Sequence, residues 1–147
     1  MELKRVVVTG LGAITPLGHN VADTWAAVVD GVSGAGPITR FDASLFKTQF
    51  ACEVKDFDPS LYFDRKEARK YDRYAQYAVI AAKEGVEDSG LDLEKVNKNR
   101  VGVIFAAGIG GIRTFEEEVG GFYLNEDKGP RFNPFFIPKM IADIAAG

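Results

Sequence analysis

The sequence is poor in the residues that cross-link secreted proteins or bind metals. Its 147 residues include one cysteine, Cys52, and one histidine, His19. A single cysteine excludes an intramolecular disulfide framework and is typical of a protein in a reducing compartment. The opening Met-Glu-Leu-Lys-Arg does not form a signal-peptide pattern, and no Asn-X-Ser/Thr glycosylation triplet occurs. We therefore expect a cytoplasmic protein.

Long apolar runs and an excess of positive charge are also missing. No apolar run approaches the roughly 20 residues that cross a bilayer. The formal net charge of −3 argues against general binding to nucleic acid or to anionic membranes. With 46% hydrophobic and 27% charged residues, the chain has the composition of a folded globular protein. Its length is about that of one domain, and it contains no internal repeats or low-complexity linkers.

Short apolar runs alternate with helical patterns. Residues 5–9 and 100–107 are rich in β-branched and aromatic residues, which predicts strands covered on both faces, as in a parallel sheet. Between them, Asn20 is a good N-cap for a helix that ends at Gly31 and carries Trp25 on its core face. The order strand, helix, strand, helix, strand predicts an α/β domain with a largely parallel sheet.

Cys52 lies in a segment where Phe50, Cys52 and Val54 alternate as in a half-buried strand. This pattern predicts that Cys52 is a small core residue. His19 is distant in sequence, and nothing else marks the thiol as activated, so a nucleophilic role is disfavoured.

The longest helical pattern covers residues 65–89 and ends at Gly90. One face is apolar, and the opposite face carries four positive charges at helical spacing: Lys66, Arg69, Lys70 and Arg73. Such a stripe is compatible with an ordinary solvated face with local ion pairs. It is also compatible with a docking face for an acidic protein or a phosphate group.

Gly108-Ile109-Gly110-Gly111 follows the second predicted strand directly. Glycines of this kind let the backbone turn tightly or approach another group closely. Ligands of open α/β sheets bind beyond the carboxyl ends of the strands, so Ile109 is a candidate wall of a ligand pocket.

The last third of the chain predicts a short helix followed by an unusual apolar link. Thr114 to Glu117 form a capping-box pattern, which explains the acidic residues there better than metal binding does. Gly120-Gly121 predicts a turn. The segment 133–138 holds two prolines around three large apolar residues and predicts a stiff, non-helical link. Residues 139–147 are helix-like, and no cofactor or metal is expected.

A nucleotide-binding function finds little support. Gly10 and Gly12 begin a dinucleotide fingerprint, but the third glycine is missing at the required spacing. Pro16 lies where the phosphate-binding helix would run. A phosphate- or nucleotide-binding α/β module is therefore retained only as an alternative.

Taken together, several segments resemble the N-terminal part of the β-ketoacyl-acyl-carrier-protein synthases, and the type II members most closely. The resemblance extends along essentially all 147 residues. It rests on residues 5–12, Phe41-Asp42, Arg65-Lys66-Glu67, Asp72, Asp88-Ser89-Gly90, Gly108-Ile109-Gly110-Gly111 and Pro134-Phe135-Phe136-Ile137-Pro138.

The resemblance implies a thiolase-like fold, of which this chain is most of the N-terminal half, and a homodimer. It implies elongation of fatty acyl chains by decarboxylative Claisen condensation of an acyl-enzyme with malonyl-acyl carrier protein. The nucleophilic cysteine and two histidines of the family correspond to positions beyond Gly147, so residues 1–147 are expected to be an incomplete, inactive domain that folds poorly alone. A non-catalytic chain-length-factor-like subunit is the second alternative.

The resemblance also implies binding residues. Ile109 matches a residue that borders the inner acyl pocket, and Phe136 and Ile137 match residues that line its far end from the dimer partner. Lys66, Arg69 and Lys70 match basic residues that meet acyl carrier protein, and Arg131 is a further candidate. An apolar lining suits a fatty chain because each buried methylene contributes about 0.8 kcal/mol.

Overall fold

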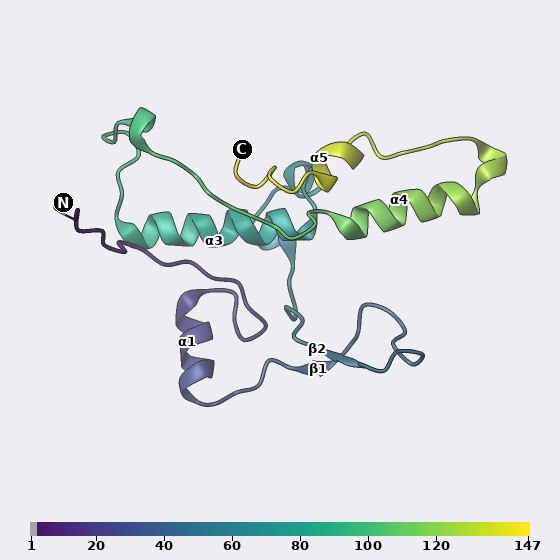
Figure 1. Cartoon of the computed structure of the whole chain (residues 1–147), viewed down its shortest axis with the longest axis horizontal. Helices are drawn as coiled ribbons and strands as arrows, with labels where there is room; N and C mark the ends of the chain where they lie inside the picture. The colour runs from purple at the N-terminus through teal and green to yellow at the C-terminus, as the bar shows by residue number, and fades with distance from the viewer. Residues whose placement is uncertain (1–2) are drawn as a thin grey trace. The chain divides into compact units, whose positions relative to one another are not determined.

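The computed structural model describes residues 3–147 (Figure 1). The chain divides into two compact units. The first unit consists of the residues up to Phe57 together with Ile80–Leu91, and the second of Asp58–Val79 together with Asp92–Gly147. The long helix α3 (Arg73–Ser89) contributes residues to both units.

The first unit contains helix α1 (Val21–Val29) and the strands β1 (Gly36–Pro37) and β2 (Phe50–Ala51). The side chain of Asn20 accepts a hydrogen bond of 2.7 Å from the backbone N–H of Asp23, so the predicted N-cap is confirmed. β1 and β2 pair antiparallel, with Gly36 opposite Ala51. The strand expected around Cys52 is thus present only at its first two residues.

The N-terminal segment of the first unit contacts the last turns of α3 through a glycine. A Cβ atom at Gly12 would collide with the carbonyl oxygen of Ala81, so only glycine allows this approach. The Glu84 carboxylate accepts 2.8 Å hydrogen bonds from the backbone N–H groups of Ala13 and Val21. One helix side chain thereby fixes both the segment after Gly12 and the start of α1.

In the second unit, the helix expected over 65–89 is interrupted. It is divided into α2 (Arg65–Ala68) and α3, with residues 69–72 between them, and η1 (Pro59–Leu61) precedes α2. The Asp64 carboxylate caps α2 through the N–H groups of Lys66 and Glu67. The buried Gln76 amide donates a 3.0 Å hydrogen bond to the Ala68 carbonyl oxygen, which replaces a bond of a continuous helix.

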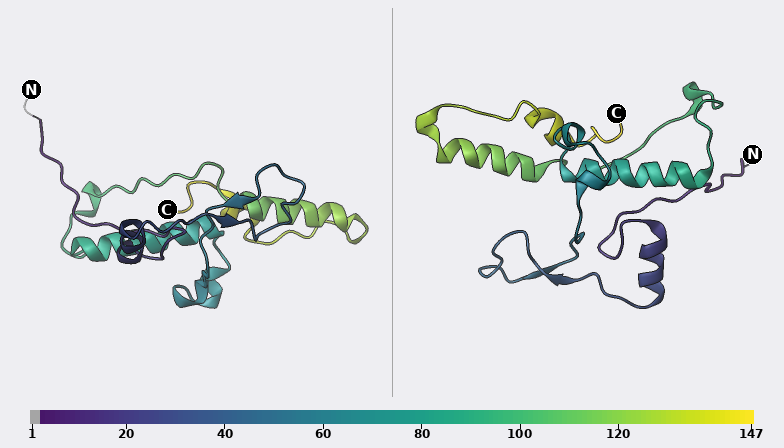
Figure 2. Two further views of the ribbon diagram at one scale, coloured as in Figure 1. Left: turned by 90° about the horizontal axis from the view of Figure 1, so that it is seen from below. Right: turned by 180° about the vertical axis from the view of Figure 1, so that it is seen from behind.

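The remaining elements of the second unit are η2 (Lys98–Arg100), α4 (Ile112–Leu124), η3 (Glu126–Lys128) and α5 (Phe136–Met140). After η3 the chain returns alongside α4 to α5 (Figures 1 and 2), and Asn133 N–H donates a 2.8 Å hydrogen bond to Glu118 on α4. The turn expected at Gly120-Gly121 is wrong, because both glycines lie inside α4.

Two expectations for the C-terminal segment are also wrong. The apolar link was expected to be non-helical, but Pro138 is the third residue of α5. In the first turn of a helix the N–H group has no intrahelical partner, so proline is tolerated there. The helix expected over 139–147 ends at Met140, and turns follow it.

The largely parallel sheet is not seen in residues 3–147, where β1 and β2 form the one described sheet. Residues 5–9 and 100–107 are not assigned to strands. Their side chains are largely exposed, with Val8 at 80% and Ile104 at 99%. A parallel strand needs a hydrogen-bonded neighbour and a cover on each face, and neither segment has these within the described residues.

Few large apolar side chains are buried in the described part of the chain. The buried apolar residues are Ala43, Phe57, Ala75, Ala78 and Ile80. Trp25 was expected in the core but is 66% exposed. Its helix forms as predicted, yet the side chains that would cover its apolar face are not supplied by the first unit.

This exposure gives a testable expectation for stability. A purified fragment of residues 1–147 should melt broadly by circular dichroism and bind a hydrophobic dye, because small buried residues contribute little to stability. A sharp, cooperative transition of the fragment without dye binding would contradict the expectation.

Candidate functional site

The candidate site is built around the glycine turn that carries Ile109. Gly110 has a φ of +78°, a conformation that favours glycine. Cβ atoms at Gly110 and Gly111 would collide with the carbonyl oxygens of Met140 and Lys139, respectively. The N–H of Gly111 donates a 3.2 Å hydrogen bond to the Met140 oxygen. The glycines are therefore needed because the turn lies directly against the end of α5, and Ile109 is left 67% exposed.

Phe136 and Ile137 form the start of α5, so the same turn joins them to Ile109 within one unit. Phe136 is part of an aromatic row. Its ring stacks on Phe115 of α4 and on Phe132, with centroids 6.2 Å and 5.6 Å away, and Phe132 in turn stacks on Phe122. Ile137 is 54% exposed. The row fixes Phe136, whereas Ile109 and Ile137 present free apolar surface.

Asp72 and Tyr74 also contact these segments, although no pattern in the sequence predicted a role at the site for either residue. The Asp72 carboxylate accepts a hydrogen bond from the hydroxyl of Thr114, which is buried on α4. The Tyr74 phenol donates a hydrogen bond to the carbonyl oxygen of Ile141. Thr114 thus does not act as the predicted N-cap, and Gly111 precedes α4 instead. The signal in the sequence that could have indicated a role for Asp72 is its polar side chain beside an otherwise apolar helix face.

In the second unit, the pKa values of Tyr74 and Arg113 are raised by their immediate surroundings. Burial, and then the carboxylates of Asp72 and Asp143, raise the pKa of the Tyr74 phenol above its usual value of 10.0. The hydrogen bond to Glu117, at 2.7 Å, raises the pKa of the Arg113 guanidinium further. Both groups therefore remain hydrogen-bond donors at neutral pH.

The four predicted basic contacts are distributed over two parts of the second unit. Lys66 lies on α2 and Arg69 is its C-cap, and both are exposed, whereas Lys70 is half-buried. The break between α2 and α3 means that they do not form one straight helical stripe with Arg73. Of the basic residues predicted for this segment, Lys66 and Arg69 are therefore the exposed ones.

Arg131 is exposed and borders a hollow of about 320 Å³ beside the end of α4. The lining has both signs of charge: Glu117, Glu118, Gly121, Phe122, Asn125, Lys128, Gly129 and Arg131. Two of the carboxylates are already engaged, Glu117 by Arg113 and Glu118 by the Asn133 N–H. The mixture suits a polar protein contact better than a deeply bound anion.

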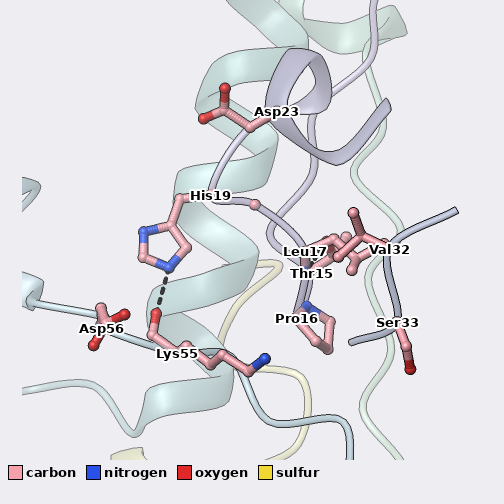
Figure 3. A pocket seen from close by; sticks show the side chains of 10 residues that line it. Thr15, Pro16, Leu17, His19, Asp23, Val32, Ser33, Lys55 and Asp56 are labelled. Carbon is pink, nitrogen blue, oxygen red and sulfur yellow. Dashed lines mark hydrogen bonds between the residues drawn. The ribbon is translucent and has the colours of Figure 1, made fainter. Parts of the chain in front are cut away.

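A separate hollow of about 470 Å³ lies in the first unit, around His19 and Lys55 (Figure 3). The His19 ring nitrogen Nε2 is 2.8 Å from the Lys55 carbonyl oxygen, and the ring packs edge-on against Phe57 with centroids 6.0 Å apart. Asp23 and Asp56 also line the hollow. The His19 imidazole thus holds the segment 55–57 through the Lys55 carbonyl oxygen and the Phe57 ring.

Cys52 is exposed, so the prediction of a small core residue is wrong. β2 ends at Ala51, and the strand that would have placed Cys52 against a core does not continue. Among residues 3–147, no group of three or more His, Cys, Asp or Glu side chains is arranged to hold a metal ion. No helix among those residues is both long enough and apolar enough to cross a membrane.

Comparison with known proteins identifies the class to which this arrangement belongs. The family described as the N-terminal domain of the beta-ketoacyl synthases matches residues 3–147. The chain is therefore a member of the β-ketoacyl synthase N-terminal domain family.

Two curated relatives of the chain share one name. The chain is 49% identical, over its whole length, to the 3-oxoacyl-[acyl-carrier-protein] synthase 2 of Coxiella burnetii, of which it covers 35%. It is 47% identical to the synthase of that name from Synechocystis, again covering 35% of it. The chain thus spans about a third of the length of the curated relatives it matches.

Solved structures agree on the fold. One match is the solved structure of a type II polyketide synthase acyl-carrier protein in complex with its ketosynthase. The TM-score is 0.75 at 28% identity, and the match covers 99% of this chain and 37% of the chain in that structure. The ishigamide ketosynthase/chain length factor is matched with a TM-score of 0.66 at 30% identity, over 95% and 34%. The chain therefore has the fold of a ketosynthase segment.

Proposed function

We propose that the protein to which this segment belongs is a type II β-ketoacyl-acyl-carrier-protein synthase that elongates fatty acyl chains. The observation that carries the proposal is the 49% identity, along the whole chain, to a 3-oxoacyl-[acyl-carrier-protein] synthase 2. Relatives of the same name from Staphylococcus aureus are 45% identical over 98% of the chain. The lack of a basic excess and the single exposed cysteine fit a cytoplasmic enzyme of this kind.

The proposed reaction joins an acyl group to a two-carbon unit. A cysteine thiolate takes the acyl chain from acyl carrier protein as a thioester. Malonyl-acyl carrier protein loses CO₂, and the resulting carbanion attacks the thioester carbonyl and expels the thiolate. The product is a 3-oxoacyl-acyl carrier protein two carbons longer. Family resemblance puts the cysteine and the two stabilising histidines outside residues 1–147, so neither Cys52 nor His19 takes part in the reaction.

We further propose a thiolase-like architecture for the longer protein, with two similar α/β halves and a homodimer. Residues 5–9 and 100–107 then serve as strands of a largely parallel sheet. Their β-branched composition and their exposure in this chain support the proposal, because such segments are normally covered on both faces. Residues 1–147 form most of the N-terminal half and are inactive alone.

The segment supplies binding surfaces to the proposed enzyme. Ile109 borders the acyl pocket, and Phe136 and Ile137 line its far end from across the dimer. Lys66, Arg69, Lys70 and Arg131 contact acyl carrier protein, which is acidic. The exposure of Ile109, Ile137, Lys66 and Arg69 leaves these side chains available for such contacts.

The decisive experiment is a condensation assay with the complete protein. Acyl-loaded and malonyl-loaded acyl carrier proteins are mixed with it, and the carrier is analysed by mass spectrometry. The expected product is a 3-oxoacyl carrier two carbons longer, formed together with CO₂. Absence of this product with carriers that support a known synthase would overturn the proposal.

A non-catalytic chain-length-factor-like subunit is the alternative, favoured by the 30% identity to the ishigamide ketosynthase/chain length factor. Such a subunit would carry no acyl-accepting cysteine. Incubation with acyl-acyl carrier protein, followed by intact-mass measurement, separates the two functions. An acyl adduct on the complete protein supports the synthase, and an unmodified mass supports the alternative.

A further inference from the structure

Asp72 lies in the interruption between α2 and α3 and contacts the start of α4 and the end of the glycine turn that precedes it. Its Oδ2 accepts the hydrogen bond from the buried hydroxyl of Thr114. The same oxygen is 3.2 Å from the position a Cβ atom would take at Gly111. The Asp72 carboxylate and the Lys139 carbonyl therefore both lie close to the position that a side chain at Gly111 would take.

Tyr74 holds the end of α5, which meets the glycine turn through the Gly111–Met140 hydrogen bond. Its phenol donates to the carbonyl oxygen of Ile141, the residue that follows α5. The raised pKa of the phenol keeps it protonated, so it stays a donor over the physiological pH range. Two side chains only two positions apart thus hold the start of α4, directly after the turn that carries Ile109, and the residue that follows the helix carrying Phe136.

From this arrangement we propose that Asp72, Thr114 and Tyr74 are positioning residues that set the acyl chain length the enzyme accepts. They hold the Ile109 turn and α5 at a fixed separation, and they do not touch the reacting atoms. The inference rests on the proposed function, in which Ile109, Phe136 and Ile137 line acyl pockets.

The turn needs such support because its own side chains supply none. Three of its four residues are glycines, which restrict the backbone least, and Ile109 is exposed. The bond from the Gly111 N–H to the Met140 oxygen holds the turn directly, and the bond from Thr114 to Asp72 holds the first turn of α4, which follows it. Misplacement of a substrate-contacting group by about 1 Å is enough to change rates a hundredfold.

The test uses Thr114→Val and Thr114→Ser in the complete enzyme. Valine keeps the shape and loses the hydroxyl that Asp72 accepts, whereas serine keeps the hydroxyl. For Thr114→Val we expect kcat/KM for palmitoyl-acyl carrier protein to fall about tenfold while the value for hexanoyl-acyl carrier protein stays within about twofold. Thr114→Ser should retain the wild-type ratio of the two values.

Tyr74→Phe is the second variant and keeps the proposal testable if Thr114→Val fails to fold. Its matched control is Tyr123→Phe, because Tyr123 is an exposed residue of α4. Tyr74→Phe should lower the palmitoyl-to-hexanoyl ratio about tenfold, and Tyr123→Phe should not change it. A loss that is equal for both substrates in every folded variant indicates a merely structural role and overturns the inference.

Ile109→Phe, measured in parallel, separates failure of the inference from failure of the proposed function. If Ile109→Phe changes the ratio while Thr114→Val and Tyr74→Phe do not, the acyl pocket stands and the positioning role is wrong. If Ile109→Phe leaves the ratio unchanged, the proposed pocket wall is wrong and the inference fails with it.

Discussion

The double variant Lys66→Glu/Arg69→Glu of the complete protein is expected to bind acyl carrier protein about a hundredfold more weakly at low ionic strength. Each reversal replaces an attraction to an acidic partner by a repulsion. At contact distance in water, unit charges interact by about 1 kcal/mol, so two reversals cost about 4 kcal/mol at most. The mobility of exposed side chains reduces this to roughly 3 kcal/mol, which corresponds to about a hundredfold in the dissociation constant. The dissociation constant, measured by surface plasmon resonance or fluorescence anisotropy, checks the prediction.

The structure indicates that the double variant leaves the fold of α2 intact. α2 is capped by the Asp64 carboxylate through backbone N–H groups, so the helix start does not depend on the Lys66 side chain. A glutamate at position 66 lies in the first turn, where negative charge is favourable. The effect should also shrink in high salt, because screening reduces the Debye length to about 3 Å at 1 M.

The matched control is Lys95→Glu/Lys98→Glu, which changes the net charge by the same amount. Lys95 and Lys98 are exposed residues of the same unit and form ion pairs with Asp92 and Glu94, at 2.8 Å and 3.9 Å. Exposed pairs of this kind contribute little to stability. Equal weakening by both double variants would indicate a general effect of net charge, and unchanged binding by the first would remove α2 as the docking site.

The features that were correctly predicted from the sequence depend on neighbouring residues. Asn20 caps α1 because its own side chain reaches the Asp23 N–H three positions on. Gly90 ends α3 because a residue with a φ of +63° is needed there. Such signals need no knowledge of what the rest of the chain contacts.

The features that were missed depend on contacts between distant residues. The break after α2 is stabilised by Gln76, whose amide reaches back eight positions to Ala68. Thr114 fits a capping box in sequence, but its hydroxyl is used by Asp72, 42 positions away. The parallel strands are absent from the described residues for the same reason, since a strand is defined by a neighbour that sequence periodicity does not provide.

The candidate site divides in the same way. Ile109 could be found from its glycine neighbours, and Phe136 and Ile137 from the resemblance to a family. No local pattern in the sequence indicated that these two segments meet in one unit through the Gly111–Met140 hydrogen bond. Asp72 was noticed only as part of a resemblance, and its position against the glycine turn gives it a physical role.

The Ile109→Phe variant of the complete enzyme is expected to lose activity on long acyl chains and to keep it on short ones. If the larger ring excludes two or three methylenes from the pocket, about 2 kcal/mol of binding is lost at 0.8 kcal/mol each. This corresponds to a fall of roughly thirtyfold in kcat/KM for palmitoyl-acyl carrier protein. The value for hexanoyl-acyl carrier protein should remain within about twofold, because that chain does not reach the blocked part.

The geometry of the turn allows this substitution to be interpreted. Ile109 lies between Gly108 and Gly110, and the positive φ belongs to Gly110, so a phenylalanine at 109 requires no unusual backbone conformation. Ile109 is largely exposed in residues 3–147, so the larger ring displaces no buried side chain of this segment. Ile109→Val, which removes one methylene and keeps an aliphatic wall, is the control and should extend palmitoyl chains at nearly the wild-type rate. If Ile109→Phe extends long chains as well as the control does, Ile109 does not border the acyl pocket, and the pocket wall must be sought among other residues.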